Sequence, residues 1–195
     1  MTYSIIGSGK VGTALARQFA RNGIAVGIAN TRGPGTLAAL AKELGDTITP
    51  QTLQEAFQAD IVILATPFRA HHELAGAVPD WNQRIVIDAM NTYGIPAEEL
   101  GGKLSSDLVA ASLAGARVVK TFNQLPAALL AKEPAQDGGR RVMFVWSRDT
   151  GASATVVELV NRLGFAAITL GGTTDEGKLV ALGGPLILQN LIKLA

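Results

Sequence analysis

The chain has 195 residues, of which 48% are hydrophobic and 17% are charged, and its formal net charge at pH 7 is +1. This length allows one domain with a substantial core, and a net charge near zero argues against nucleic acid as a general partner. No apolar run reaches the roughly 18 residues that cross a bilayer, and no leader precedes the first expected strand, so we expect a cytoplasmic protein without membrane contact. Cysteine is absent, which excludes disulfides and thiolate metal sites, and we expect no metal site of another kind.

Residues 3–32 carry the most specific pattern in the chain. A short apolar strand is followed by Gly7, Gly9 and Gly12 in the spacing G-x-G-x-x-G, then by an amphipathic helix and a second apolar strand. In that context the first glycine makes a tight turn, the second lets the backbone approach a pyrophosphate, and the third lets the helix pack on the strand. The pyrophosphate then lies at the helix N-terminus. The predicted dinucleotide-binding loop therefore comprises Gly7, Ser8, Gly9, Lys10, Val11 and Gly12.

The end of the second strand indicates which dinucleotide binds. A site for NAD places Asp or Glu there, on the ribose 2′-hydroxyl, whereas this chain has Asn30. Asn30 is followed by Thr31, a hydroxyl donor, and by Arg32, whose guanidinium can bind a phosphate with two parallel hydrogen bonds. A charged contact of this kind contributes about 1.5–3 kcal/mol. No acidic residue precedes Glu43, so the local field also suits phosphates, and we predict NADP(H) as the cofactor.

The rest of the chain alternates between helical and strand patterns. A helix is expected over about residues 35–44, a strand around Ile48, and a loop over residues 134–139. Four further apolar runs are typical of strands that are buried on both faces of a parallel sheet, namely residues 61–65, 84–87, 116–122 and 142–146. This alternation predicts an α/β fold with a Rossmann-type doubly wound parallel sheet.

We assign residues 1–195 to a single NADP-binding Rossmann-like domain, with residues 171–195 as a short C-terminal helical extension. In that extension residues 183–195 begin with turn residues and are then apolar almost all round, which predicts a buried helix. We expect this helix to form the contact of a homodimer. The alternative is that it packs within its own chain against the sheet.

The doubly wound fold also predicts where the crevice lies, because ligands of such sheets bind outside the carboxyl ends of the strands. Thr66 and Pro67 follow the fourth expected strand, Asn91 follows the fifth, and Asn123 ends the sixth. We therefore expect these residues to line one crevice with the glycine loop. Pro67 constrains Thr66 toward extended backbone, which suits a wall beside the ribose or the nicotinamide.

Together these segments resemble the family of NADPH-dependent reductases of the deazaflavin coenzyme F-420, a family also similar to the cytoplasmic domain of membrane ferric reductases. The resemblance covers nearly the whole chain and rests on GSGKVG, ANTR, ATPF, VVKTFN and the final glycine-rich turn. It implies that a second cofactor, F-420 or a flavin, lies over the nicotinamide. Gly33 stands where relatives often have a second basic residue, which concentrates the phosphate contact on Arg32. By position the resemblance assigns cofactor contacts to Gly7, Ser8, Gly9, Lys10, Val11, Asn30, Thr31, Arg32, Thr66, Pro67 and Asn123.

We expect hydride transfer between NADP(H) and a deazaflavin or flavin acceptor, which requires orientation more than a side-chain acid, and we assign no catalytic residue. A second hypothesis is reduction of a small carbonyl or imine, which needs a proton donor. The candidates are His71, His72, Tyr93 and Lys120, although Lys120 also fits a strand-end cation paired with a carboxylate. A third hypothesis is an NADPH-binding sensor or interaction protein without turnover.

Overall fold

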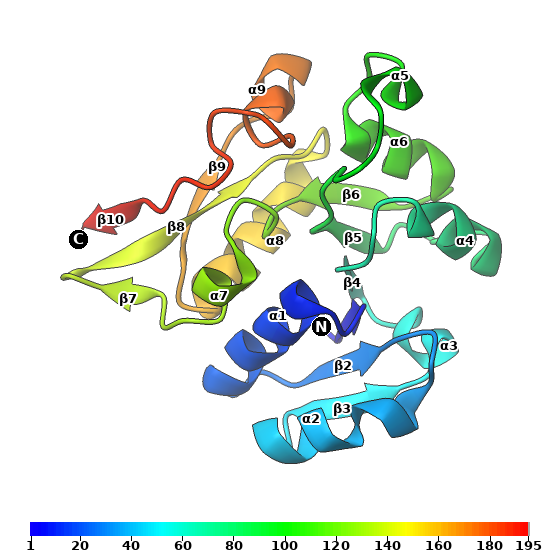
Figure 1. The fold of residues 1–195 in the computed structure, drawn as a ribbon, viewed down its shortest axis with the longest axis vertical. Helices are drawn as coiled ribbons and strands as arrows, with labels where there is room; N and C mark the ends of the chain where they lie inside the picture. The colour runs from blue at the N-terminus through cyan, green and yellow to red at the C-terminus, as the bar shows by residue number, and fades with distance from the viewer. Residues whose placement is uncertain (195) are drawn as a thin grey trace.

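A six-stranded parallel sheet forms the centre of the computed structural model, which describes residues 1–194 (Figure 1). The strand order is β3-β2-β1-β4-β5-β6. The chain thus adds β2 and β3 on one side of β1 and then returns to add β4, β5 and β6 on the other side. The Rossmann-type doubly wound parallel sheet predicted from the sequence is therefore confirmed. Its strands are β1 (Tyr3–Ile6), β2 (Val26–Ala29), β3 (Ile48–Gln51), β4 (Ile61–Leu64), β5 (Ile85–Asp88) and β6 (Arg117–Lys120).

Alternate side chains of these strands pack into two separate cores, one on each face of the sheet. Ile5 and Ile63 lie in the first core, whereas Ile6 and Val62 lie in the second. Because both faces are buried, the strands read as continuous apolar runs. The first face is covered by α1 (Lys10–Arg21), the 3-10 turn η1 (Pro34–Leu37), α2 (Ala38–Leu44), α7 (Ala127–Leu130) and α8 (Thr150–Arg162). The second face is covered by α3 (Leu53–Ala56), α4 (Ala70–Ala77), α5 (Ala97–Leu100) and α6 (Ser105–Ser112).

The apolar run at residues 142–146 is a strand, as predicted, but it does not join the main sheet. It belongs to β8 (Gly139–Val145), which pairs antiparallel with β7 (Ala135–Gln136) and β10 (Ile192–Leu194), and parallel with β9 (Ala166–Thr169). An isolated antiparallel bridge between Lys120 and Trp146 links it to the end of β6. The expected loop at residues 134–139 is in fact a hairpin. Its turn at residues 137 and 138 has positive φ at both positions, 51° and 77°, so it reverses the chain directly before β8.

The predicted helix at residues 183–195 is wrong. The extension contains one short helix, α9 (Thr174–Leu179), and then turns until it reaches strand β10, while Ala195 lies outside the described residues. A short apolar run fits a strand as well as a helix, and pairing with β8 decides between them here. Leu188 also takes a left-handed φ of 65°, which a helix cannot include. The homodimer remains a prediction, because the helix on which it rested does not form. Among residues 1–194, no helix combines the length and apolar character needed to cross a bilayer.

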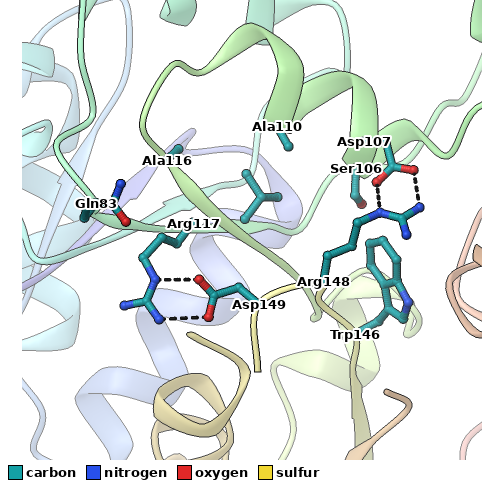
Figure 2. A pocket seen from close by; sticks show the side chains of 10 residues that line it. Gln83, Ser106, Asp107, Ala110, Ala116, Arg117, Trp146, Arg148 and Asp149 are labelled. Atoms are coloured by element: carbon teal, nitrogen blue, oxygen red, sulfur yellow. Dashed lines mark hydrogen bonds and ion pairs between the residues drawn. The ribbon is translucent and has the colours of Figure 1, made fainter. Parts of the chain in front are cut away.

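Two arginine–aspartate pairs tie the segment between β8 and α8 to β6 and to α6 (Figure 2). Arg117 at the start of β6 donates from Nε and Nη2 to Asp149, over 2.7 and 2.8 Å, and Arg148 donates from Nε and Nη2 to Asp107, over 2.7 Å each. The pairs flank a cavity of about 320 Å³ between α6, β6 and the segment after β8. Because each guanidinium already binds a carboxylate in bidentate geometry, this cavity presents no free cation to an anionic ligand.

The first of these pairs gives a pH-dependent contribution to stability. The hydrogen bonds from Arg117, and then the backbone N–H of Ala152, hold the pKa of Asp149 well below its usual range. A lowered pKa in the folded state stabilises the protein above the unfolded-state pKa of about 4, and that contribution is lost as the pH falls below it. Asp149→Asn is therefore expected to lower the free energy of unfolding by about 1 kcal/mol near neutral pH, since the pair is partly exposed, and by less near pH 3.

Urea unfolding of the variant and the parent at the two pH values measures this difference. Asp46→Asn is the matched control, because Asp46 is exposed and forms no ion pair with the described part of the chain. A destabilisation by Asp149→Asn that is equally large near pH 3 and near neutral pH would contradict the assignment.

Candidate functional site

The three glycines of the first loop have different surroundings at the carboxyl end of β1. Gly7 takes a φ of 113°, and a Cβ there would collide with the carbonyl oxygen of Ala65. A Cβ on Gly12 would collide with the carbonyl oxygen of Gly7, because helix and loop pack without a gap. Beside Gly9, in contrast, a Cβ would meet no atom within 4 Å. Gly7 and Gly12 therefore serve the turn and the packing, and Gly9 leaves open space above the helix.

The N-terminus of α1 faces this open space with its amides uncapped. Gly9 is the N-cap residue, so no side chain accepts a hydrogen bond from the first turn, and no acidic residue lies in that turn. Lys10 is exposed, Val11 is half-buried, and the Thr13 hydroxyl donates to the Ser8 carbonyl over 3.3 Å. Free amides and the positive end of the helix dipole make this terminus suitable for an anion such as a pyrophosphate.

The residues after β2 form an ordered loop with one free cation. Asn30 donates from Nδ2 to the hydroxyls of Ser8 and Thr36, over 2.9 and 3.0 Å, and its Oδ1 accepts from the backbone N–H of Arg32 over 2.9 Å. The side chain of Asn30 therefore orients the loop. Arg32 is exposed, and its guanidinium forms no ion pair or hydrogen bond within residues 1–194. It is available to an anionic ligand.

A cavity of about 340 Å³ lies beside this loop, at the carboxyl ends of β1, β2 and β4. Its far walls come from α3 and α4 and are mostly apolar, with Leu53, Phe57 and Leu74 among them. These walls could not be predicted from the sequence, because short helices without clear periodicity do not reveal which face they present. The residues predicted from the sequence that line the cavity are Gly7, Ser8, Gly9, Asn30, Thr31, Arg32, Thr66 and Pro67.

The other predicted residues lie close by but outside this cavity. Lys10 borders a more open groove of about 600 Å³ between α1 and α7. Asn91 and Asn123 bond to each other at the ends of β5 and β6. Asn91 donates from Nδ2 to the Asn123 carbonyl over 2.8 Å, and Asn123 donates from Nδ2 to Asn91 Oδ1 over 3.0 Å and to the Val180 carbonyl over 2.9 Å. The Asn123 Oδ1 is buried without a partner in the described residues. The structure thus brings Asn91 and Asn123 together as a pair beside the end of β4.

Two of the four candidate proton donors are buried and bonded within the protein, and the other two are exposed. His71 is buried, with Nδ1 2.5 Å from the Phe68 carbonyl oxygen, and burial lowers its pKa. His72 and Tyr93 are exposed. Lys120 is 3% exposed and lies 3.1 Å from the Asp88 carboxylate, which itself has no exposed surface. Lys120 is thus a strand-end cation paired with a carboxylate, which is the alternative that its position in the sequence also allowed.

This pair is part of a buried polar network under the end of β5. Lys120 also donates to the Met90 carbonyl, and Asp88 accepts from the Ser106 hydroxyl over 2.8 Å and from the Met90 N–H over 3.0 Å. The Thr66 hydroxyl, 3.3 Å from the Met90 sulfur, connects the network to the end of β4. The network therefore holds the backbone that leads into Asn91 at the crevice.

A family model and two crystal structures are similar to this chain. A model of the family described as NADP oxidoreductase, coenzyme F420-dependent, matches residues 2–92. The crystal structure of a hypothetical protein from Sinorhizobium meliloti is 41% identical, with 99% of this chain and 96% of that chain covered and a TM-score of 0.94. A protein from Arthrobacter sp. FB24, named as a candidate F420-dependent NADP reductase, is 25% identical, with 99% and 100% covered and a TM-score of 0.76.

A curated relative matches a smaller part of the chain. It is a UDP-N-acetylmuramoylalanine–D-glutamate ligase from Albidiferax ferrireducens, 42% identical over 99 residues, which are 50% of this chain. The match covers 19% of that protein, so this chain spans about a fifth of the length of the curated relative.

Proposed function

We propose that this chain, which belongs to the family of NADP oxidoreductases described as coenzyme F420-dependent, transfers a hydride between NADP(H) and a deazaflavin or flavin acceptor. As a member of that family it is an NADP-dependent oxidoreductase. The observation that carries the choice of cofactor is the free guanidinium of Arg32, which lies beside an uncapped helix N-terminus.

The residues at the ends of β1 and β2 fit NADP(H). The open space at Gly9 admits a pyrophosphate, and the amides that follow it are uncapped donors for its oxygens. The guanidinium of Arg32 suits the 2′-phosphate, and Asn30 in place of an acid removes the repulsion that would exclude this phosphate. The largely apolar cavity between the loop and α4 would then take the adenine.

NADPH supplies a hydride when bound and becomes NADP⁺ by losing two electrons and one proton. The contribution of this chain is to orient the reacting groups. Thr66 and Pro67 at the end of β4 would bound the nicotinamide side of the crevice, next to the paired amides of Asn91 and Asn123. Holding two rings in register accounts for much of the rate of such a transfer.

The surroundings of the candidate acids favour a ring acceptor over a carbonyl or an imine. A carbonyl or imine acceptor needs a proton donor at the reacting atom. The two buried candidates, His71 and Lys120, are bound to Phe68 and Asp88, and the other two are exposed. An oxidised deazaflavin or flavin that receives a hydride from NADPH can take the one accompanying proton from solvent, so these residues need not take part.

The proposal is tested by mixing the protein with NADPH and either F-420 or FMN, and by following NADPH oxidation by absorbance. Turnover with one of these acceptors is the expected result. Tight NADPH binding without turnover with any flavin or deazaflavin would favour the sensor hypothesis instead. Turnover with small imines or ketones alone would favour the second enzyme hypothesis.

Replacement of Arg32 tests the assignment of the cofactor separately. Arg32→Ala is expected to weaken NADPH binding by about ten- to hundredfold and to leave NADH binding unchanged, because only NADPH carries the 2′-phosphate. Titration calorimetry measures both affinities. Arg140→Ala is the matched control, since Arg140 is exposed on β8 and does not line the crevice. Equal losses for NADPH and NADH would place Arg32 outside the phosphate site.

A further inference from the structure

One acidic side chain in the cavity beside Arg32 has no part in the proposed contacts with the phosphates or the nicotinamide. Glu73 lines the cavity from α4 with Ala70, Leu74 and Ala77. These positions are spaced by three and four residues, so they share one face of the helix, and that face is turned to the cavity. Glu73 forms no hydrogen bond or ion pair with any of residues 1–194, and in particular no ion pair with Arg32 across the cavity.

An unpaired carboxylate is unfavourable next to a ligand that carries several phosphates unless it meets a hydrogen-bond donor of that ligand. Glu73 is exposed at the edge of the cavity, so water solvates its carboxylate while the site is empty. A base bound there would displace some of this water, and the largely apolar walls with Leu53, Phe57 and Leu74 offer no donor in its place. The replacement donor must then come from the ligand. An apolar slot with one acceptor at its edge is the complement of a flat aromatic ring that carries one amino group.

We propose that Glu73 accepts a hydrogen bond from the exocyclic amino group of adenine, and so makes this cavity selective for the adenine base of the dinucleotide. The inference rests on the proposed binding of NADP(H), in which Arg32 and the α1 N-terminus hold the phosphates and the cavity holds the base. Glu73 is thereby a residue for base specificity, separate from the residue that distinguishes NADP from NAD.

The experiment compares NADPH with its deamino analogue, in which hypoxanthine replaces adenine and a carbonyl oxygen stands where the amino group was. The carboxylate of Glu73 attracts the amino group and repels the carbonyl oxygen. The parent protein is expected to bind NADPH about tenfold more tightly than the analogue, the lower range for a hydrogen bond to a charged group. In Glu73→Ala the ratio is expected to fall to about twofold or less, and Glu73→Gln, whose amide oxygen still accepts, should lie between them.

Titration calorimetry on the three proteins gives the ratios, and Glu98→Ala is the matched control. Glu98 is an exposed acid on α5 that does not line the cavity, so its loss changes the net charge equally but should leave the ratio at about tenfold. An equal ratio in the parent and in Glu73→Ala, with NADPH still bound, would overturn the inference and leave the proposed function intact. A change in the NADPH-to-NADH preference of Glu73→Ala, at a constant base ratio, would overturn it by assigning Glu73 to the ribose. Failure of the parent to bind NADPH at all would overturn both.

Discussion

Lys120→Met is expected to lower the free energy of unfolding by about 3–5 kcal/mol, because it leaves the carboxylate of Asp88 buried without its counter-ion. The two side chains are 3% and 0% exposed, so water cannot replace the lost partner. Ser106 and the Met90 amide still donate to Asp88, but neither carries charge. For a chain of this size the loss corresponds to a melting temperature lower by roughly 6–20 °C. Urea and thermal unfolding measure the effect.

The double variant Asp88→Asn with Lys120→Met separates the buried charge from the loss of contacts. In the double variant the oxygen of the amide introduced at position 88 can still accept from the Met90 N–H, and neither position carries charge. We therefore expect the double variant to be more stable than Lys120→Met alone. A Lys120→Met variant as stable as the parent but without reductase activity would reverse the assignment and return Lys120 to the list of proton donors.

Gly12→Val is expected to lower the free energy of unfolding by about 3 kcal/mol or more. The new Cβ would collide with the carbonyl oxygen of Gly7, a backbone atom that cannot move without shifting the turn after β1. Valine has a somewhat higher helix propensity than glycine, but this gain of a few tenths of a kcal/mol is far smaller than the cost of the collision. Chemical denaturation in the absence of cofactor measures this effect.

Gly9→Val is the matched variant, since it makes the same substitution three residues earlier in the same loop. Its Cβ meets no protein atom within 4 Å, so stability should change by less than about 1 kcal/mol, the cost of a poorer N-cap. NADPH affinity, in contrast, should fall at least about tenfold, because the side chain fills the space for the pyrophosphate. If Gly9→Val binds NADPH as the parent does, the pyrophosphate lies elsewhere.

The first part of the fold was predictable because several patterns agree there. A strand, the G-x-G-x-x-G spacing, an amphipathic helix and a second strand all require the same arrangement over residues 3–32, and strands buried on both faces leave long apolar runs. The C-terminal part offers no such agreement. The run at residues 183–195 is short and apolar, so its state depends on whether β8 is beside it, and the sequence does not contain that information locally.

The residues of the candidate site also differ in how far the sequence could predict them. The loop residues Gly7, Gly9 and Gly12 and the phosphate candidate Arg32 could be proposed from the sequence, because backbone approach and charge restrict the residue types that can serve there. The amides of Asn91 and Asn123 were expected at the crevice, but their bonds to each other depend on distances between strand ends. The α4 side of the cavity could not be predicted, because α4 is short and its sequence AHHELAGA indicates no clear buried face.

The hydrogen bonds of Asn30 have a consequence for the thermodynamics of cofactor binding. They hold the loop after β2 against Ser8 and Thr36 and fix the backbone N–H of Arg32. The backbone is thus preorganised, and little conformational entropy is left to lose when NADPH arrives. The main remaining ordering cost on this side of the site is the immobilisation of the Arg32 side chain, about 0.5–1.5 kcal/mol. A loop that needs no folding step also predicts that association is limited by diffusion and orientation instead of by rearrangement.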